Sequence, residues 1–361
     1  MAAETVLYAP APVPAPRLGV ALRPALAALR GLAGFGAPDI VSAAAEQWTV
    51  AEGGSVEVRP ARFLAGQLDR ITGTEFGTRD EIVRDFRGGF VSRQGPTRGY
   101  RLNKVLLFDG VLYADGAVRH LRARQHRARF GSPDETIARA ALYESWLGNR
   151  WFANWLSDDC LTYRLAEQEG FPVTTARCSG HMAEYERRLG ITPRRIGATW
   201  FDELILFDDR AHNDHLRSRA SDLRRRLVGA ERPRHSGAFL LRGTTGALRM
   251  LKNERAIAEH LAARRGFRVI DASTATVAEI VEACAGAQVV MGVEGSHLGH
   301  GMVLMPPGAC LFTIQPPDRA VSVLKLVTDR QGQDYSFVVG RGKHEAFCAD
   351  IGEIERTLDL A

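Results

Sequence analysis

The spacing of apolar residues changes along this chain, and in its first third the spacing is typical of short strands. Three apolar runs, KVLLF, VLYA and AVRHL, lie between residues 104 and 121, separated by Asp109-Gly110 and Asp115-Gly116. Asp-Gly pairs between apolar runs are typical of two-residue hairpin turns, because both residues tolerate a positive φ. The pattern therefore predicts a small antiparallel meander near residues 101–121.

After this meander the spacing becomes that of helices alternating with strands. Apolar residues recur at helical intervals over 134–147 and 149–169, and Gly170 is suited to cap the end of the second helix. The elements expected next are a strand at 171–175, a helix at 181–190, a buried strand at 202–207 and a basic helix at 218–229.

The last third has the most regular alternation. The predicted strands are 238–242, 267–271, 287–293 and 309–315, with helices at 253–265 and 277–287 between them. Strands and helices that alternate with short loops are typical of an α/β fold with a doubly wound, mainly parallel sheet. The polar, proline-bearing stretch 229–237 predicts a domain boundary. We expect an N-terminal domain over 1–232 with an extended Pro/Ala lead-in, and a C-terminal domain over 233–361 whose last helix packs back on the first.

Composition and charge narrow the class of protein. The 361 residues are 45% hydrophobic and 25% charged, which is typical of a globular protein and excludes disorder. Of 47 basic residues all but Lys104, Lys252, Lys325 and Lys343 are arginine, and the net charge is +5. Arginine presents a planar fork to phosphates and carboxylates, so the surplus admits an anionic partner. Because 42 acidic residues are interleaved with the basic ones, no nucleic-acid partner is predicted.

The cysteines and the N-terminal stretch predict the compartment. The five cysteines form no CxxC pair, which is typical of free thiols in a reducing compartment. The first residues lack the basic and apolar regions of a signal peptide, and residues 18–36 are interrupted by Arg23, Pro24 and Arg30. We therefore expect a cytoplasmic protein. The stretch 18–36 either packs on the body of the protein or lies peripherally against the inner face of the membrane.

The strongest candidate motif is VVMGVEGSHLGHG, residues 289–301. An apolar strand enters a glycine-containing turn, and an apolar helix follows it. Gly295 allows a ligand to approach the backbone closely, Ser296 can cap the helix, and N–H groups at a helix start attract anions. The spacing fits neither GxGxxG nor a Walker A loop. The turn therefore predicts either an anion site or a structural connection.

Metal binding is the alternative function for the polar side chains of this turn. His297 and His300 are three residues apart and can share a helix face beside Glu294. Zinc requires a third protein ligand, and the sequence supplies neither an HExxH motif nor a cysteine partner. Hydrogen bonding to a ligand is favoured, and no metal site is predicted.

A second group of candidates follows the strand at 238–242. Strands of a parallel sheet end at one edge, so this loop is expected beside the turn at 294–300. Basic side chains there suit a diphosphate, and an amide or carboxylate suits ribose hydroxyls; the alternative is a solvated loop capped by Asn253. The candidates are Arg242, Arg249, Lys252, Asn253 and Glu254.

Two further segments carry polar side chains, and the sequence allows two interpretations of each segment. The strand at 202–207 ends in Asp208-Asp209, which can hold a divalent cation or simply end the strand in a turn. In NRWFANWLSDDC, residues 149–160, Asn154 and Asp158 share a helix face. Trp155 suits either a core or a sugar-binding surface, so this helix stays a candidate for the edge of a cleft.

The order of these motifs resembles glycosyltransferase family 61, also known as DUF563. Arg242 and the Asn253-Glu254 pair precede GFRVID, and AQVVMGVEGSHLGHGMVLMPPGACLFTI resembles the family's HGAGLTN turn and its PPG break. NRWFANWLSDDC is similar to the family's NYxHWLxDxLP helix. In this chain Glu294 and Asn154 stand where the family has histidines, and Ser296, His297 and His300 depart from its turn.

The resemblance implies a GT-B-like fold, with two Rossmann-like domains facing a cleft. It implies an inverting hexosyl- or pentosyltransferase with a UDP-linked sugar donor and a glycan acceptor, in the branch that makes bacterial capsular or surface polysaccharide. No cofactor and no essential divalent metal are expected. The donor would contact Arg242, Arg249, Lys252, Asn253, Glu254, Gly295, Ser296, His297 and His300; the acceptor would contact Asn154 and Trp155.

The catalytic base expected for such a reaction is Asp158, followed by Glu294 and His297. Two alternatives stay open. One is a metal-dependent GT-A-type transferase that uses Asp208 and Asp209. The other is a non-catalytic protein that binds a nucleotide or polyanion.

Overall fold

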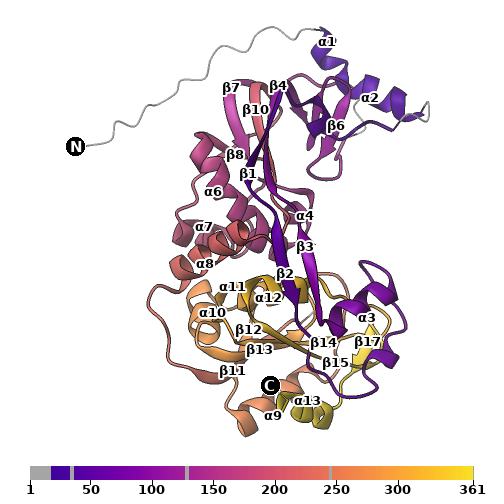
Figure 1. Cartoon of the computed structure of the whole chain (residues 1–361), viewed down its shortest axis with the longest axis vertical. Helices are drawn as coiled ribbons and strands as arrows, with labels where there is room; N and C mark the ends of the chain where they lie inside the picture. The colour runs from indigo at the N-terminus through magenta and orange to yellow at the C-terminus, as the bar shows by residue number, and fades with distance from the viewer. Residues whose placement is uncertain (1–17, 33–35, 127–129, 244–245, 361) are drawn as a thin grey trace.

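The computed structural model describes residues 18–32, 36–126, 130–243 and 246–360, and the predicted Pro/Ala lead-in lies outside them. The described residues form two large sheets, one in each half of an elongated molecule (Figure 1), and two further pairs of strands. The first sheet contains strands from the first 208 residues, and the second contains strands from residue 235 onward. The α/β fold class predicted from the sequence is confirmed.

The first sheet is mixed rather than parallel throughout. Its strands are β1 (Glu46–Ala51), β4 (Thr97–Phe108), β5 (Val111–Ala114), β6 (Ala117–His120), β7 (Glu135–Leu142), β8 (Pro172–Thr174), β9 (Arg194–Arg195) and β10 (Thr199–Asp208). Their order is β6-β5-β4-β10-β7-β8-β9, with β1 added to β4. Because β10 is antiparallel to β4 and parallel to β7, only one half of this sheet has a Rossmann-like character.

The predicted meander is present at the antiparallel side of this sheet. Strands β4, β5 and β6 pair in sequence. The turns between them have positive φ at Asp109 (48°), Gly110 (73°), Asp115 (43°) and Gly116 (82°). Positive φ at both central residues is the geometry that favours Asp-Gly, so the turn residues determine the hairpins as expected.

The helix predicted over 134–147 is wrong in its first part. Residues Glu135–Leu142 form β7, which lies between β10 and β8. Alanine and arginine favour a helix in isolation, but this segment is paired on both sides and its last three residues are buried. Tertiary pairing therefore overrides local propensity. A helix begins only at α4 (Trp146–Arg150), where the Ser145 hydroxyl accepts a hydrogen bond from the N–H of Gly148.

The helix predicted over 149–169 is confirmed in large part. It consists of α5 (Phe152–Asn154), a π-helical turn (Trp155–Asp159) and α6 (Cys160–Glu169), and it ends at Gly170. A π-helical turn inserts an extra residue and often occurs near functional sites. Two more helices, α7 (Met182–Leu189) and α8 (Asp214–Val228), contact each other, and α8 also contacts α6.

The second sheet is parallel throughout. Its order is β12-β11-β13-β14-β15, with the bounds β11 (His235–Leu241), β12 (Arg268–Asp271), β13 (Ala287–Val293), β14 (Cys310–Gln315) and β15 (Asp334–Val339). The chain moves from β11 to β12 on one side, then returns to build the sheet on the other side. The switch in direction lies between β11 and β13, and ligands of such sheets bind beyond the carboxyl ends of the strands at that point.

Five helices and a small hairpin complete this half. The helices are α9 (Glu254–Arg265), α10 (Val277–Cys284), α11 (Leu298–Leu304), α12 (Val323–Gln331) and α13 (Ile351–Leu358), and the hairpin is β16 (Arg341–Lys343) with β17 (Ala346–Cys348). Helix α13 contacts β15, and Ile354 belongs to the core cluster that contains Phe239. Its Glu353 also accepts hydrogen bonds from Arg70, at 2.6 Å from both terminal nitrogens.

A segment from early in the chain lies against the second sheet. It includes β2 (Gly54–Val58), a short 3-10 turn (Leu68–Arg70), α3 (Arg79–Arg87) and β3 (Phe90–Gln94). Bridges join Arg62 to Ser336 and Thr74 to Ala320, and the rings of Phe86 and Phe337 stack 4.3 Å apart. Helix α3 also contacts α12, although the two are far apart in sequence. The domain bounds 1–232 and 233–361 stay a prediction.

One hydrophobic core runs across the junction of the two halves. It contains Tyr163 and Tyr185 from the first half and Val290 and Leu298 from the second. A Cβ placed on Gly299 would lie 2.9 Å from the Cα of Ala153, so α11 approaches α5 at backbone distance. The two most distinctive motifs of the sequence therefore meet at this junction.

Helices α1 (Leu18–Ala21) and α2 (Arg23–Leu32) begin the described chain, ahead of a 3-10 turn (Ile40–Ala43). Arg23 of α2 donates a hydrogen bond to the carbonyl oxygen of Tyr113 at 3.1 Å, which places this helix against the meander. Within the described residues, no helix combines the length and the apolar character needed to span a bilayer.

Candidate functional site

Three arginines converge where the second sheet changes direction. Arg242 follows β11, and Arg249 lies in the same connection to α9. A Cβ placed on Gly295, just after β13, would lie 2.0 Å from Nη1 of Arg242 and 3.3 Å from Nη1 of Arg249. Both guanidinium groups therefore lie against this glycine. The third arginine is Arg319, in the loop after β14, whose charge acts on both of the others. We call Arg242, Arg249 and Arg319 the arginine cluster.

The cluster is largely buried and is balanced by carboxylates. Arg242 and Arg249 are 6% and 7% exposed, and Glu294 is 5% exposed. Arg249 forms an ion pair with the Glu294 carboxylate and donates to the Glu294 carbonyl oxygen at 2.7 Å. Burial lowers the pKa of Arg242 to about 10, with a further contribution from Arg249. Burial also raises the pKa of Glu294, against the opposing effect of Arg249.

Sequence reasoning missed Arg319 and its partner Glu75. The Arg319 guanidinium forms an ion pair with Glu75 at 2.9 Å, and this contact lowers the pKa of Glu75. Arg319 follows the carboxyl end of β14, which neighbours β13 in the sheet. Ligands bind beyond the carboxyl ends of parallel strands, so the argument that identified Arg242 also applies to Arg319. Glu75 is 244 residues away in sequence, and no local pattern could have found it.

The structure gives Asn253 and Glu254 positioning roles. Asn253 exchanges two hydrogen bonds with the backbone of Ala349, at 2.8 and 3.2 Å. Glu254 accepts from the backbone N–H groups of Arg242 (2.8 Å) and Gly243 (3.2 Å). These contacts fix the loop that carries the arginines. Lys252 is exposed, and its backbone N–H donates to the carbonyl oxygen of Phe347 at 2.8 Å.

The turn that precedes α11 separates its two histidines. His297 lies near the carbonyl oxygen of Leu240, and burial lowers its pKa to about 3, so its ring is neutral. His300 is 3% exposed and faces the other half of the molecule, where Nδ1 lies 2.7 Å from the hydroxyl of Tyr185. Burial lowers the pKa of His300 well below its usual value. Ser296 is half-buried in the turn.

Asp158 lies at the junction of the two halves rather than in the arginine cluster. Its carboxylate accepts a hydrogen bond from Asn154 at 2.8 Å and lies 3.7 Å from Nη1 of Arg330, at the end of α12. Burial raises the pKa of Asp158, although the charge of Arg330 opposes this shift. Arg319 precedes the start of α12, and at 1.5 Å per residue this nine-residue helix is about 13 Å long.

A pocket of about 410 Å³ lies beside Trp155, in the first half of the molecule. Trp155 is buried, and Asn154 is half-buried beside it. The pocket is lined by Arg122, Gln125, Gly148, Asn149, Arg150, Trp151, Phe152, Trp155, Thr175, Ala176, Arg177, Ser179 and Met182. The predicted acceptor-side residue Trp155 therefore lines a cavity.

The alternative cation site at Asp208-Asp209 does not fit the structure. Both carboxylate oxygens of Asp209 accept from Arg219 at 2.6 Å, and the hydroxyls of Thr97 and Thr162 donate to the same oxygens. Asp208 is exposed, whereas Asp209 is 5% exposed. Asp209 is therefore a buried counter-ion of Arg219, and the two aspartates do not form a pair of metal ligands.

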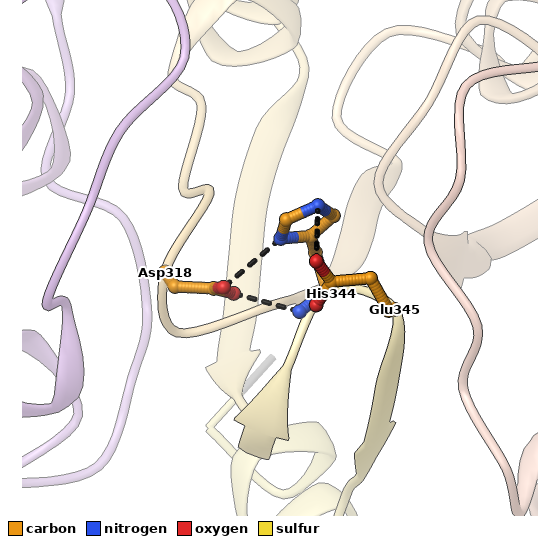
Figure 2. Close-up of side chains that lie close together, drawn as sticks. All are labelled: Asp318, His344 and Glu345. Carbon is orange, nitrogen blue, oxygen red and sulfur yellow. Dashed lines mark hydrogen bonds and ion pairs between the residues drawn. The ribbon is translucent and has the colours of Figure 1, made fainter.

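Within the described ranges, one group of three side chains could in principle hold a metal ion. Asp318, His344 and Glu345 bring their ligand atoms within 4.8 Å of one another. Figure 2 shows the Asp318 carboxylate bonded to both the ring Nδ1 of His344 (2.9 Å) and its backbone N–H (2.8 Å). Nε2 of His344 lies 3.3 Å from Glu345. Through this contact the β16–β17 hairpin is held against the loop that carries Arg319.

Comparison with known proteins gives one family match. The family model of glycosyltransferase 61 matches residues 119–312, which include the pocket side chains, Arg242, Arg249 and the turn at Gly295. No curated protein matches this chain. A solved structure that matches is the metal-soaked Flv1 flavodiiron core from Synechocystis sp. PCC6803, with 12% identity and a TM-score of 0.24. The match covers 73% of this chain and 62% of that one, and at this TM-score it supports no conclusion about fold or function.

Proposed function

This chain belongs to glycosyltransferase family 61, and on that premise we propose that it moves a sugar from a UDP-linked donor to a glycan acceptor with inversion. The observation that carries the proposal is the position of Arg242 and Arg249 against Gly295 at the switch point of the parallel sheet, with Arg319 near enough for its charge to act on both. A parallel sheet binds its ligand there, and arginine forks match phosphate oxygens.

The arginine cluster is suited to hold the diphosphate of the donor. The three guanidinium groups lie near the carboxylates of Glu294, Glu75 and Glu254. An arriving diphosphate would compete with these carboxylates for the arginines. When the bond between the sugar and the diphosphate breaks, the same arginines would stabilise the negative charge that develops on the leaving oxygen.

These positions support a division of roles between the two halves of the chain. We propose a GT-B-like arrangement in which 233–361 holds the nucleotide sugar and 1–232 faces the acceptor through Asn154 and Trp155. Lys252, Ser296 and His300 stay candidates for donor contacts. Asn253 and Glu254 would act indirectly, because they fix the loop that carries Arg242. The acceptor proposed is a capsular or surface polysaccharide of a bacterium.

The transfer needs a base that takes the proton of the acceptor hydroxyl as its oxygen attacks the anomeric carbon. The candidates from the sequence are Asp158, Glu294 and His297. The geometry adds Glu75 and favours it. The Glu75 side chain is one-third exposed and is paired with Arg319, and the charges of Arg249 and of Arg150, a pocket residue, also lower its pKa. It therefore lies between the proposed donor and acceptor sites.

A panel of nucleotide sugars tests the proposed function. Purified protein is incubated with UDP-, GDP- and CMP-linked sugars and bacterial polysaccharide fragments, and released nucleotide and elongated glycan are both quantified. Transfer from a UDP-linked donor, with the anomeric configuration inverted, supports the proposal. Saturable nucleotide binding without transfer from any donor would instead favour the non-catalytic alternative.

EDTA tests the proposed independence from metal. We expect transfer to proceed at an unchanged rate in EDTA, because the arginines supply the positive charge that a metal would otherwise supply. Loss of transfer, with recovery on addition of Mn²⁺, would favour a metal-dependent mechanism. His344→Gln would then show whether Asp318, His344 and Glu345 hold the ion.

We also propose that α2 contacts the inner face of the membrane. Leu26, Leu29 and Leu32 are 55%, 56% and 74% exposed, and Arg30 is exposed beside them. Exposed leucines next to arginine are typical of helices that lie in the interface of anionic lipids. Flotation with anionic vesicles is expected for the intact chain and should be lost in a variant with all three leucines changed to serine.

A further inference from the structure

The pocket beside Trp155 has an unusual charge. Three of its lining residues, Arg122, Arg150 and Arg177, are basic, and no acidic residue lines it. Within the described part of the chain, none of these three arginines forms an ion pair; Arg122 donates to the hydroxyl of Thr175 at 2.8 Å. The nearby buried carboxylate of Glu144 accepts from Thr174, Thr175 and Ala176, so it fixes the floor of the pocket instead of neutralising the arginines.

The rest of the lining suits a carbohydrate. Trp151, Phe152 and Trp155 provide aromatic surfaces, and Gln125, Asn149 and Ser179 provide polar groups. The guanidinium of Arg150 lies over the ring of Trp151, 4.5 Å from its centroid, which holds this exposed charge at the pocket wall. A sugar ring can stack on an aromatic side chain while its charged substituent meets an arginine fork.

The pocket is joined to the arginine cluster by one loop. The Phe76 ring contacts the Trp151 ring edge-on, with centroids 5.2 Å apart. The neighbouring residue, Glu75, is ion-paired with Arg319. A ligand in the pocket would therefore lie next to the carboxylate that faces the cluster, which is the position an acceptor requires.

We propose that this pocket binds an acidic glycan, and that the acceptor of the transferase carries carboxylate or phosphate groups along its chain. The identification of this glycan as the acceptor rests on the proposed function. The binding of an acidic glycan by the pocket does not depend on it. Arg122, Arg150 and Arg177 contact the anionic groups, and the half-buried Trp151 and Phe152 contact the sugar rings.

Isothermal titration calorimetry with matched probes tests the proposal. Trigalacturonic acid and its neutral methyl ester form one pair; maltotriose phosphorylated on a 6-hydroxyl and plain maltotriose form the other. We expect at least one acidic probe to bind at least tenfold more tightly than its neutral partner. The pair that shows the difference identifies the anionic group as carboxylate or phosphate.

Two exposed residues provide variants that should leave the fold intact. Arg150→Gln and Arg177→Gln are each expected to weaken binding of the acidic probe by about tenfold, because each removes a charge-assisted contact. Arg264→Gln, on the exposed face of α9 in the other half, is the matched control and should leave the affinity unchanged. Thermal unfolding of each variant confirms that the fold is retained.

Titrations with and without UDP separate this inference from the proposed function. If the acidic probe binds only in the absence of UDP and loses affinity in Arg319→Gln, it occupies the arginine cluster and the inference is overturned. Equal affinities for acidic and neutral probes, or no binding of either acidic probe, also overturn it. Absence of UDP binding contradicts the proposed function but leaves the pocket result interpretable.

Discussion

The molecule contains two groups of arginines that differ in how their charge is balanced. In the arginine cluster, Arg249 is buried against Glu294, and Arg319 is paired with Glu75. In the pocket, Arg150 and Arg177 are exposed, and neither forms an ion pair within the described residues. A buried charge without a partner costs several kcal/mol, whereas an exposed one keeps its hydration. Internal pairing therefore maintains the first group, and the second is left available to an external anion.

This difference has a consequence for binding. A ligand of the cluster must displace carboxylates from buried arginines, which suits a diphosphate with several oxygens. A ligand of the pocket has only water to displace from the exposed arginines, which suits a chain of single charges. The same residue type therefore serves two kinds of anion, according to burial.

The largest expected effect is on turnover, at the loop between the two groups. Glu75→Gln removes the proposed base and should lower kcat by about 10²–10⁴-fold. UDP should bind this variant at least as tightly as the wild type, because a carboxylate that competes for Arg319 is removed. Asp158→Asn, compared under the same conditions, should lower kcat less than tenfold, because Asp158 contacts Arg330 rather than the cluster. Steady-state kinetics with a transferable donor gives both values. The opposite order would restore Asp158 as the base.

The pH dependence of kcat/KM, which reports the pKa values of the free enzyme, separates the same two carboxylates. The pKa of Glu75 is lowered by Arg319, so a Glu75 base stays deprotonated until the pH falls below the usual glutamate value of 4.5. The pKa of Asp158 is raised by burial, so an Asp158 base would lose activity on acidification while the pH is still above 3.8. We expect kcat/KM to stay constant between pH 7 and pH 5. A decline within that range that disappears in Asp158→Asn would argue for Asp158.

The next largest effect is expected on the stability of the fold, when a buried arginine loses its counter-ion. Asp209→Asn leaves Arg219, which is 9% exposed, without its partner, and should lower the free energy of unfolding by about 3–5 kcal/mol. The exposed neighbour Asp208 provides the control. Asp208→Asn should change the free energy of unfolding by less than about 0.5 kcal/mol. Urea unfolding measures both. Equal losses of stability in the two variants would mean that a buried ion pair is worth no more to this fold than an exposed aspartate.

A smaller effect is expected from the glycine that the cluster surrounds. Gly295→Ala places a methyl group where Nη1 of Arg242 lies, at a φ of +156°, and should displace that guanidinium. The affinity for UDP is expected to fall by roughly tenfold, or about 1.4 kcal/mol. Gly54→Ala, where a Cβ meets no atom within 4 Å, is the matched control. Unchanged UDP affinity in Gly295→Ala would place the diphosphate elsewhere.

The smallest expected effect is that of salt concentration on the two binding affinities. Raising NaCl from 50 to 300 mM should weaken binding of the acidic glycan by a few-fold, because exposed charges are screened over about 10 Å or less. UDP binding at the buried cluster should change less. Calorimetric titrations at four salt concentrations compare the two slopes, and a steeper slope for UDP would reverse the assignment of buried and exposed groups.

The sequence predicted the parts of the fold that depend on local pattern. The Asp-Gly hairpins, the strand at 287–293 and the turn at Gly295 follow from turn chemistry and from alternation. β7 was missed because its alanines and arginine favour a helix until β10 and β8 pair with it. Local propensity cannot report a pairing that forms between distant segments.

The candidate site shows the same limit. Arg242 and Arg249 were found because strand ends are visible in the sequence, whereas Glu75 is brought to Arg319 by a segment that crosses to the other half of the molecule. Asn253 and Glu254 form hydrogen bonds with backbone groups, which their residue types alone could not reveal, and their predicted contacts with the donor stay a prediction. The arginine-lined pocket was missed because Arg122 and Arg177 meet only in three dimensions.

The most direct test of the central claim is the affinity of UDP for Arg319→Gln, measured by calorimetry beside wild type and Arg264→Gln. Arg319 pairs with a partly exposed carboxylate, so its removal leaves no buried charge unpaired and the fold should persist. If the arginine cluster holds the diphosphate, UDP should bind the wild type and the control equally and Arg319→Gln at least tenfold more weakly. Equal UDP affinity in all three proteins would contradict the assignment of the donor site.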